Sequence, residues 1–354
     1  MKIFFALLCC SYLFADTEED AKIRSYFLAP EITELPVSDW LNPTFEDYSM
    51  IQKHMRANLH RVINTPVAER LFPKDRLDGE HVVQGWIAYR LGRIQLVKLN
   101  SPETMPEFRI IYFNNDPEKK DKCVICFTGH GFPDKDWSRG IALMIHKLKR
   151  CNFDGHFLYR IGGWPNLAKG RLQFADVPYA FKPFFCEEAR DLGYKNILWL
   201  DACTFPVKSL DPIFELLRRN GCCFFSYRGE LSQERMQERG YVMRSLGFNP
   251  RRPYRDISSR VVGFNVAHPN GAKLLNSWIQ AAEKKVPFLE PNGDQLSFAT
   301  LVNEYRLLYC ELPAHYWEEA IGNAIRFPEP NSPALFYHHY NLLDPAISLE
   351  PFFN

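Results

Sequence analysis

The segment Gly193-Tyr-Lys-Asn-Ile-Leu-Trp-Leu-Asp-Ala-Cys203 is the most informative part of this sequence for its fold. Its residues run apolar from Ile197 into a lone carboxylate at Asp201, and the chain breaks soon afterwards at Pro206. An uninterrupted apolar run of this kind is typical of a strand buried on both faces of a parallel sheet. Ligands of open α/β sheets bind beyond the carboxyl ends of the strands. The segment therefore predicts a buried strand that delivers Asp201 to the edge where chemistry takes place.

Strand-like and helix-like patterns alternate on both sides of this segment. The chain from Lys122 onwards carries short apolar runs bounded by turn residues, and amphipathic stretches lie between them. Such alternation predicts an α/β fold with a mainly parallel sheet and helices on both faces. The further strands are expected at Cys123–Thr128, His156–Ile161, Cys222–Tyr227 and Val261–Val266. The helices are expected at residues 137–151, 183–192, 211–219, 271–284 and 294–305.

A charged, turn-forming stretch at residues 114–121 is the best candidate for a domain boundary. It divides an N-terminal accessory region, residues 16–115, from the α/β domain, residues 116–354. Helical spacing from Phe45 to Asn64 and an extended run from Phe108 to Phe113 predict an α+β extension for the accessory region.

Composition excludes several classes of protein. The chain has 354 residues, of which 43 are basic and 42 acidic, so the whole molecule has no electrostatic attraction to nucleic acid. Hydrophobic residues make up 46% and charged residues 24%, which is typical of a globular protein and too polar for several membrane spans.

The N-terminus has the parts of a secretory signal. One basic residue, Lys2, precedes a short apolar run from Ile3 to Ala15, and an acidic stretch follows. The run is too short to span a bilayer. We expect residues 1–15 to be a signal peptide and the protein to be exported or membrane-associated. The alternative is a buried N-terminal strand in a cytoplasmic protein.

The cysteines are interpreted as small buried hydrophobes. Cys123 and Cys126 have the spacing of a zinc or redox pair, but they lie within an apolar run. Residues three apart on a strand point to opposite faces, so these two thiols cannot share a metal.

Several blocks together resemble the core of the GT-A-fold, nucleotide-sugar-dependent glycosyltransferases, over roughly residues 122–345. The resemblance implies a GT-A-like (Rossmann-like) fold and transfer of a sugar from a nucleotide-diphosphate sugar to a glycan, lipid or protein acceptor that the sequence does not identify. The blocks are Val177–Lys182, Leu198–Ala202, Leu210–Phe214, Val262–Asn265, Trp278 and Asp294-Gln295.

The resemblance also implies a divalent cation, Mn²⁺ or Mg²⁺, near Asp201. In that family a pair of acids at the strand end holds an ion that stabilises the leaving diphosphate. This chain has Cys203 at the second position, and a thiol is a soft, poor ligand for these ions. His339 is the candidate for a supplementary ligand, which makes the expected metal set Asp201, Cys203 and His339. The alternatives are that Asp201 caps a turn and that His338-His339 is a hydrogen-bonded pair without a ligand.

Further residues are expected to hold the nucleotide. Thr128, Gly129 and His130 end the first strand of the α/β domain, where the resemblance places the base and ribose. Tyr179 could stack on the base, and Lys182, beside a helix N-terminus, could pair with the diphosphate. The alternatives are a tight turn for the glycines and an exposed lysine on a packed helix.

The donor sugar is expected near the start of a later helix. Asp294 is interpreted as a catalytic residue that orients the sugar or the attacking hydroxyl, and Gln295 and Asn265 as sugar contacts. For Asp294 the alternative is a helix N-cap.

Two other functions remain open. A GT-A-like domain without the second acid could bind a glycan or nucleotide and no longer catalyse. A thiol-dependent hydrolase would use Cys203 as nucleophile and His130 as its base.

Overall fold

The computed structural model describes residues 107–128, 137–161, 165–166, 169, 171–174, 177, 179–227, 233–251, 254–288, 292–319, 331–339, 342 and 348. The expected signal peptide, nearly all of the accessory region, Gly129 and His130 lie outside these residues. None of the helices within them is long and apolar enough to cross a membrane.

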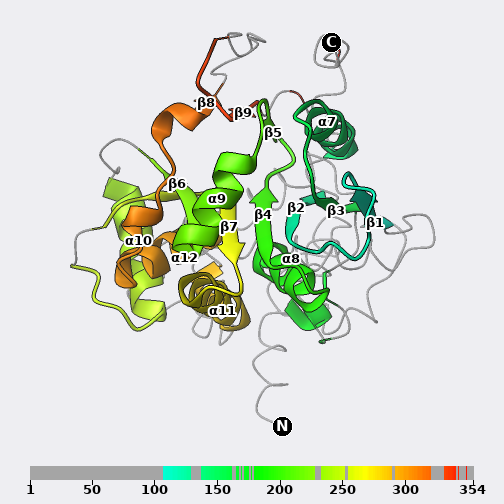
Figure 1. Ribbon diagram of the computed structural model, residues 1–354. Coiled ribbons are helices and arrows are strands. Elements are labelled where there is room, and N and C mark those ends of the chain that lie inside the picture. Colours follow the sequence, from blue (N-terminus) through cyan, green and yellow to red (C-terminus); the bar gives the residue numbers. More distant parts are fainter. Residues whose placement is uncertain are drawn as a thin grey trace, which may run out of the picture.

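The centre of the molecule is a sheet of six strands in the order β1-β3-β2-β4-β7-β6 (Figure 1). Strands β3, β2 and β4 are parallel, and β6 runs in the same direction because β6 and β4 are both antiparallel to β7. Only β1 and β7 run the other way. The expected α/β class with a mainly parallel sheet is therefore confirmed. The strand bounds are β1 Glu107–Tyr112, β2 Lys122–Thr128, β3 His156–Ile161, β4 Asn196–Leu200, β6 Cys222–Ser226 and β7 Ile257–Asn265.

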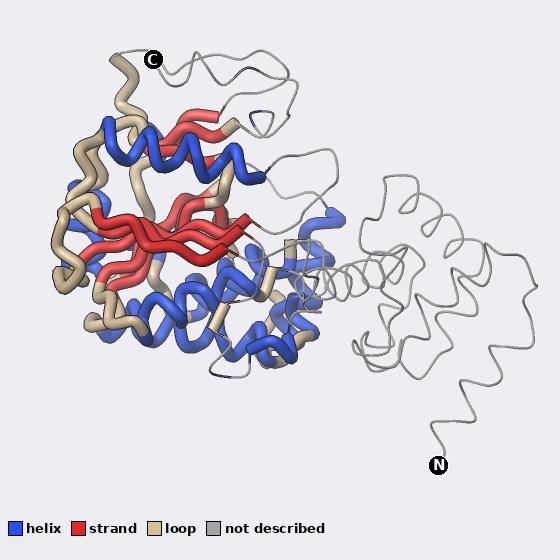
Figure 2. Tube along the Cα trace, turned by 90° about the vertical axis from the view of Figure 1, so that its right-hand side faces the viewer, coloured by secondary structure: helices blue, strands red, loops and turns tan. Residues whose placement is uncertain are grey.

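Helices cover both faces of the sheet, as the tube view shows (Figure 2). Side chains of α7 (Trp137–Arg150) and α9 (Asp211–Asn220) form the core on one face. Side chains of α8 (Phe181–Asp191), α11 (Pro269–Glu283) and α12 (Gly293–Glu304) form the core on the other. The remaining helical elements are α10 Gln233–Ser245, η4 Arg171–Phe174, η5 Val286–Phe288, η6 Leu308–Cys310 and η7 Ala314–Tyr316.

Strand β2 shows why the cysteines act as apolar residues. Cys123 belongs to the core beneath α8 and α11, whereas Cys126 belongs to the core beneath α7 and α9. The two thiols therefore face opposite sides of the sheet, as predicted. All eight cysteines in the described part of the chain are buried and unpaired by disulfides.

Strand β1 lies before the expected domain boundary and still belongs to the central sheet. It pairs with β3 along its whole length, from Glu107 opposite Ile161 to Tyr112 opposite His156. The sheet thus begins N-terminal to residue 116. The division of the chain at residues 115 and 116 stays a prediction, because most of the accessory region is outside the described residues.

The direction of β7 is the main feature that local patterns did not reveal. Val261 pairs with Leu200 and Asn265 pairs with Asn196, so β7 is antiparallel to β4. The arrows of these two strands point in opposite directions in Figure 1. Consequently β7 begins at the edge where β4 ends.

A second, small sheet has the order β5-β9-β8 and adjoins the end of β4 (Figure 1). Strand β5 (Thr204–Pro206) pairs with β9 (Phe336–His338), and β9 pairs with β8 (Trp317–Glu319). It brings the C-terminal histidines beside the residues that follow Asp201.

Candidate functional site

Asp201 is the first residue after β4 and stands at the carboxyl edge of the parallel strands. Trp199 is two residues earlier on the same face, and its Nε1 donates a hydrogen bond of 2.8 Å to Oδ1 of Asp201. The side chain of Asp201 is 23% exposed, so the carboxylate is not enclosed in hydrocarbon. The bend after β4 is closed by a backbone bond, from the N–H of Thr204 to the carbonyl of Asp201. The carboxylate therefore remains available to other side chains.

Two helices begin beside this carboxylate. Helix α8 starts at Phe181, earlier than expected, so Lys182 lies in its first turn. Helix α12 starts at Gly293 and has Asn292 at its N-cap, so Asp294 also lies in a first turn and is not the cap. Exposed backbone N–H groups at helix starts favour anions nearby.

Lys182 joins the two acids. Its Nζ lies 3.1 Å from Oδ1 of Asp201 and 2.9 Å from Oδ2 of Asp294. Burial of the ammonium group opposes its charge, but the two carboxylates outweigh burial and raise the pKa of Lys182 above its ordinary value. Lys182 is therefore charged at neutral pH.

Ser259, on β7, completes what we term the carboxylate–lysine cluster: Lys182, Asp201, Ser259 and Asp294. The Ser259 hydroxyl donates to Oδ2 of Asp294 at 2.7 Å and accepts from Nζ of Lys182 at 3.2 Å. Ser259 was not expected in the site, because the predicted strand began at Val261 and only its other end was expected beside Asp201. Only the antiparallel direction of β7 brings the start of this strand to the edge of the sheet where Asp201 lies.

The expected metal set of Asp201, Cys203 and His339 is not formed. Burial, and then the charge of Asp201, raise the pKa of the Cys203 thiol above its ordinary value, which favours the protonated thiol over the thiolate that binds metals. Oδ1 of Asp201 already accepts bonds from Lys182 and Trp199. Within the described ranges no group of three or more His, Cys, Asp or Glu side chains is arranged to hold an ion. These residues do not fit a divalent cation in the way the resemblance implied.

The C-terminal histidines nevertheless lie beside Cys203. The backbone N–H of His339 donates to the carbonyl of Cys203 at 3.0 Å, and Nδ1 of His338 is 2.9 Å from the Thr204 hydroxyl. Burial, Arg260 and His339 lower the pKa of His338 to about 3, so it is neutral. His339 is also buried, and its Nε2 has no hydrogen-bond partner in the part of the chain that the structure describes. His338 thus contacts β5 of the small sheet, and Nε2 of His339 has no hydrogen-bond partner among the described residues.

The remaining candidates lie in different surroundings. The buried Thr128 hydroxyl donates to the carbonyl of Arg160 at 3.2 Å, so its donor is used within the sheet. The ring of Tyr179 is 40% exposed, and its centre lies 5.6 Å from Nζ of Lys182. Gln295 contacts the carboxylate of Asp256 at 3.4 Å and not the carboxylate–lysine cluster. Of these three, Tyr179 is the one with an exposed face near the cluster.

Asn265 requires a correction. The expectation of a sugar contact assumed that the end of its strand lies beside the end of β4. Because β7 is antiparallel, Asn265 pairs with Asn196 at the start of β4. The two ends of a five-residue strand are roughly 13 Å apart at about 3.3 Å per residue. Asn265 therefore lies at the opposite edge of the sheet from Asp201.

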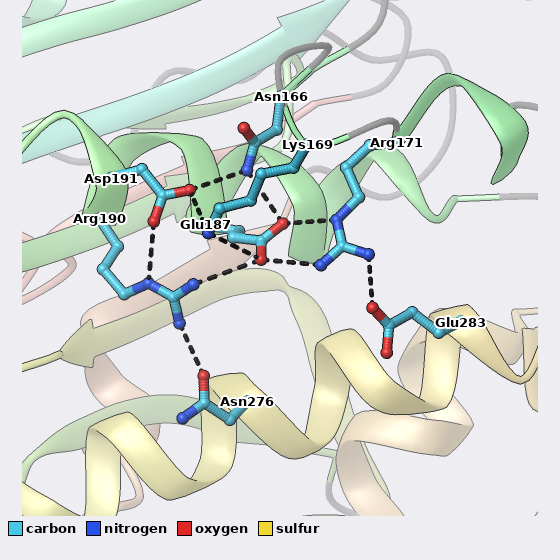
Figure 3. A network of polar contacts seen from close by, with 8 residues as sticks. All are labelled: Asn166, Lys169, Arg171, Glu187, Arg190, Asp191, Asn276 and Glu283. Atoms are coloured by element: carbon cyan, nitrogen blue, oxygen red, sulfur yellow. Dashed lines mark hydrogen bonds and ion pairs between the residues drawn. The ribbon is translucent and has the colours of Figure 1, made fainter.

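A second group of charges holds α8, the helix that carries Lys182, in place (Figure 3). Glu187 on α8 accepts bonds from Nε and Nη2 of Arg171, each at 2.8 Å, and Nη1 of Arg171 pairs with Glu283 on α11. Figure 3 shows Asn166, Lys169, Arg171 and Arg190 directed at Glu187, whereas the α11 side chains contact Arg171 and Arg190. Further partners in the same network are Asn166, Lys169, Arg190, Asp191 and Asn276.

No family model and no curated protein matches the chain. Eleven chains of solved structures do match. They include the galactosyltransferase LgtC in complex with donor and acceptor sugar analogues, with 11% identity, a TM-score of 0.37, and coverage of 65% of this chain and 94% of LgtC. Mouse xyloside xylosyltransferase 1 has 13% identity and a TM-score of 0.36, covering 63% and 98%. The bifunctional glycosyltransferase WbbM has 13% identity and a TM-score of 0.37, covering 96% and 71%. The likeness is remote and assigns no reaction to this chain.

Proposed function

We propose that this protein transfers a sugar from a nucleotide-diphosphate sugar to an acceptor. The observation that carries the proposal is the convergence of Asp201 and Asp294, from segments far apart in the sequence, on one edge of the sheet beside two helix N-termini. This is the edge where open α/β sheets bind ligands. The sequence resemblance assigns Asp201 to the diphosphate and Asp294 to the sugar or the attacking hydroxyl, so both acids are candidates for the same site.

Different groups of the site suit the diphosphate and the sugar of the donor. Backbone N–H groups at the starts of α8 and α12 favour a diphosphate, and Arg260 lies close enough to Asp201 for their charges to interact. Positive groups aimed at the leaving diphosphate would stabilise the charge that develops on it. The carboxylates suit the hydroxyl groups of a sugar or of the acceptor. The proposal does not depend on a bound metal, since no three His, Cys, Asp or Glu side chains among the described residues are arranged to hold an ion.

The test is release of nucleoside diphosphate from a panel of UDP- and GDP-sugars by the full-length protein, with Mn²⁺ and with a chelator. We expect turnover in the wild type. Substitution of either acid by its amide, Asp201→Asn or Asp294→Asn, should reduce the rate at least about 100-fold, as loss of a group acting at a reacting centre does. Glu215→Gln, which removes an exposed acid on α9, is the control and should leave the rate unchanged.

A binding protein without catalysis is the second candidate, favoured by one observation. The position of the second acid holds a buried thiol, Cys203, whose pKa is raised by burial and by Asp201. Tight binding of a sugar nucleotide or glycan without turnover under any of these conditions would support this candidate and contradict the first.

A further inference from the structure

The ammonium group of Lys182 has no donor to spare. An ammonium carries three N–H donors. The Nζ of Lys182 has three acceptors within 3.2 Å, on Asp201, Asp294 and Ser259, and the side chain is 7% exposed. A diphosphate that reached Lys182 would have to displace a carboxylate from it. Removing one partner of a buried ion pair leaves an uncompensated charge, which is strongly unfavourable.

The cluster uses one oxygen of each acid. Oδ1 of Asp201 accepts from Lys182 and Trp199, and Oδ2 of Asp294 accepts from Lys182 and Ser259. The other two oxygens have no hydrogen-bond partner within the described residues. Both carboxylates are therefore fixed in direction while each keeps a full acceptor.

We infer that Lys182 and Ser259 are positioning residues, which fix Asp201 and Asp294 through one oxygen each and leave the second oxygens to accept hydrogen bonds from the hydroxyl groups of a sugar. The inference rests on the proposed function and deepens it. It assigns the acids to the sugar, and it removes Lys182 from the groups that contact the diphosphate. Recognition of a hydroxyl group requires acceptors whose own side chains are held by neighbours.

The adjacent serine on β7 provides a matched control. Ser258 and Ser259 are buried to the same degree, at 4% and 3% exposure. The Ser258 hydroxyl accepts from the backbone N–H of Arg260, whereas the Ser259 hydroxyl bonds to Lys182 and Asp294. Replacing either serine by alanine removes a buried hydroxyl from the same strand, but only Ser259→Ala should release the Asp294 carboxylate.

The first experiment measures kcat and KM for the sugar nucleotides that the wild type consumes, together with the Kd of UDP and GDP by calorimetry. We expect Ser259→Ala to lower kcat roughly tenfold or more, as loss of a hydrogen bond to a charged group does. The Kd of the bare diphosphate should stay within about twofold, since the cluster does not contact it. Ser258→Ala should match the wild type, and Ser259→Thr, which keeps the hydroxyl, should recover most of the rate.

The second experiment uses Lys182→Met and compares affinity for UDP or GDP with affinity for the corresponding sugar nucleotide. We expect the sugar nucleotide to lose affinity and the bare diphosphate to keep it. Equal loss for both ligands would show that Lys182 binds the diphosphate and would overturn the inference. If Lys182→Met does not fold, by circular dichroism, the serine variants still decide the matter.

The outcomes for the two proposals differ. A wild type that turns over sugar nucleotides, with Ser259→Ala no slower than Ser258→Ala, overturns the inference alone. A wild type that neither binds nor consumes sugar nucleotides overturns the proposed function and the inference with it.

Discussion

At the scale of single residues, Cys203 is the position that separates this site from a two-acid metal site. The thiol is 5% exposed, and burial and Asp201 raise its pKa, so it is neutral at physiological pH. A nucleophilic cysteine needs the opposite, a pKa lowered by neighbouring positive charge. The side chain is therefore best understood as a small, buried apolar group.

Substitution of Cys203 by alanine should leave turnover within about threefold of the wild type and cost about 1 kcal/mol of stability, because only a small buried group is lost. Cys223→Ala, which removes a buried thiol from β6, is the control for stability. Rate measurement and urea unfolding check both values. If the folded Cys203→Ala variant had no turnover, the thiol would be essential, and this result would support the alternative of a hydrolase with Cys203 as its nucleophile.

At the scale of elements, strand direction decides which side chains share the site. Strands β4 and β7 are neighbours, yet the end of β4 meets the start of β7. Ser259 thereby joins the carboxylate–lysine cluster, and Asn265 lies at the opposite edge of the sheet, beside Asn196. Apolar runs reveal that a strand exists, but both directions bury the same side chains.

Asn265→Ala should therefore leave kcat and KM for the donor unchanged. Its amide oxygen accepts from the backbone N–H of Ala267, so a loss of stability of about 1 kcal/mol is expected. Steady-state kinetics on the variant, beside Ser259→Ala, compares the two ends of the same strand. A rise in KM for Asn265→Ala alone would contradict the placement of the site.

Helix α7 is held close to the turn that follows Asp201. A Cβ added to Gly140 on α7 would collide with the backbone carbonyl of Ala202. Gly140→Ala should destabilise the protein by about 1–3 kcal/mol, as overpacking does, and should reduce turnover because the turn moves.

Gly240→Ala on α10 is the matched control for Gly140→Ala, since a Cβ there has no contact shorter than 3.7 Å. Alanine favours a helix over glycine by up to about 1 kcal/mol, so this variant should be neutral or more stable. Thermal unfolding of both variants checks the pair. If Gly140→Ala were as stable as Gly240→Ala, the close approach of α7 to the turn after Asp201 would not be required.

At the scale of the whole molecule, segments distant in sequence meet around Glu187 and around β5. The network in Figure 3 joins η4, α8 and α11, and the small sheet joins residue 204 to residue 338. Both contacts support the edge that carries the carboxylate–lysine cluster, one through α8 and one through the turn after Asp201.

The Glu187 network predicts a pH-dependent stability. Burial opposes the charge of Glu187, but the hydrogen bonds from Arg171 outweigh burial and lower the pKa of the carboxyl group. Its contribution is therefore complete above the ordinary pKa of about 4.3 and is lost as the pH falls through the lower pKa of the folded state. Glu187→Gln should cost about 2 kcal/mol at pH 7, and the difference from the wild type should shrink towards pH 3.

Urea unfolding of Glu187→Gln at both pH values checks this expectation. Glu215→Gln, which breaks a pair whose acid is 72% exposed, should change stability by less than about 0.5 kcal/mol at either pH. A difference for Glu187→Gln that stays constant from pH 7 to pH 3 would argue against the ionised network.

The amino-acid pattern was enough to predict the fold class and most elements of the central sheet, but not the small sheet of β5, β8 and β9. Local periodicity predicts the strand that runs into Asp201 and the opposite faces of Cys123 and Cys126, because side chains alternate every second residue on a strand. The period of 3.6 residues likewise predicts the helices between the strands. The acids at Asp201 and Asp294 were also found from the sequence, as candidates placed at the ends of elements.

What those acids contact follows only from how the elements pack against one another. The direction of β7 and the pairing of β5 with β9 depend on contacts between residues far apart in the chain, which no local pattern records. These contacts bring Ser259 to Asp294, place Lys182 between two carboxylates, and carry Asn265 away. The physical reason is that a hydrogen bond needs two groups within about 3 Å, and the packing of the elements determines which groups come that close.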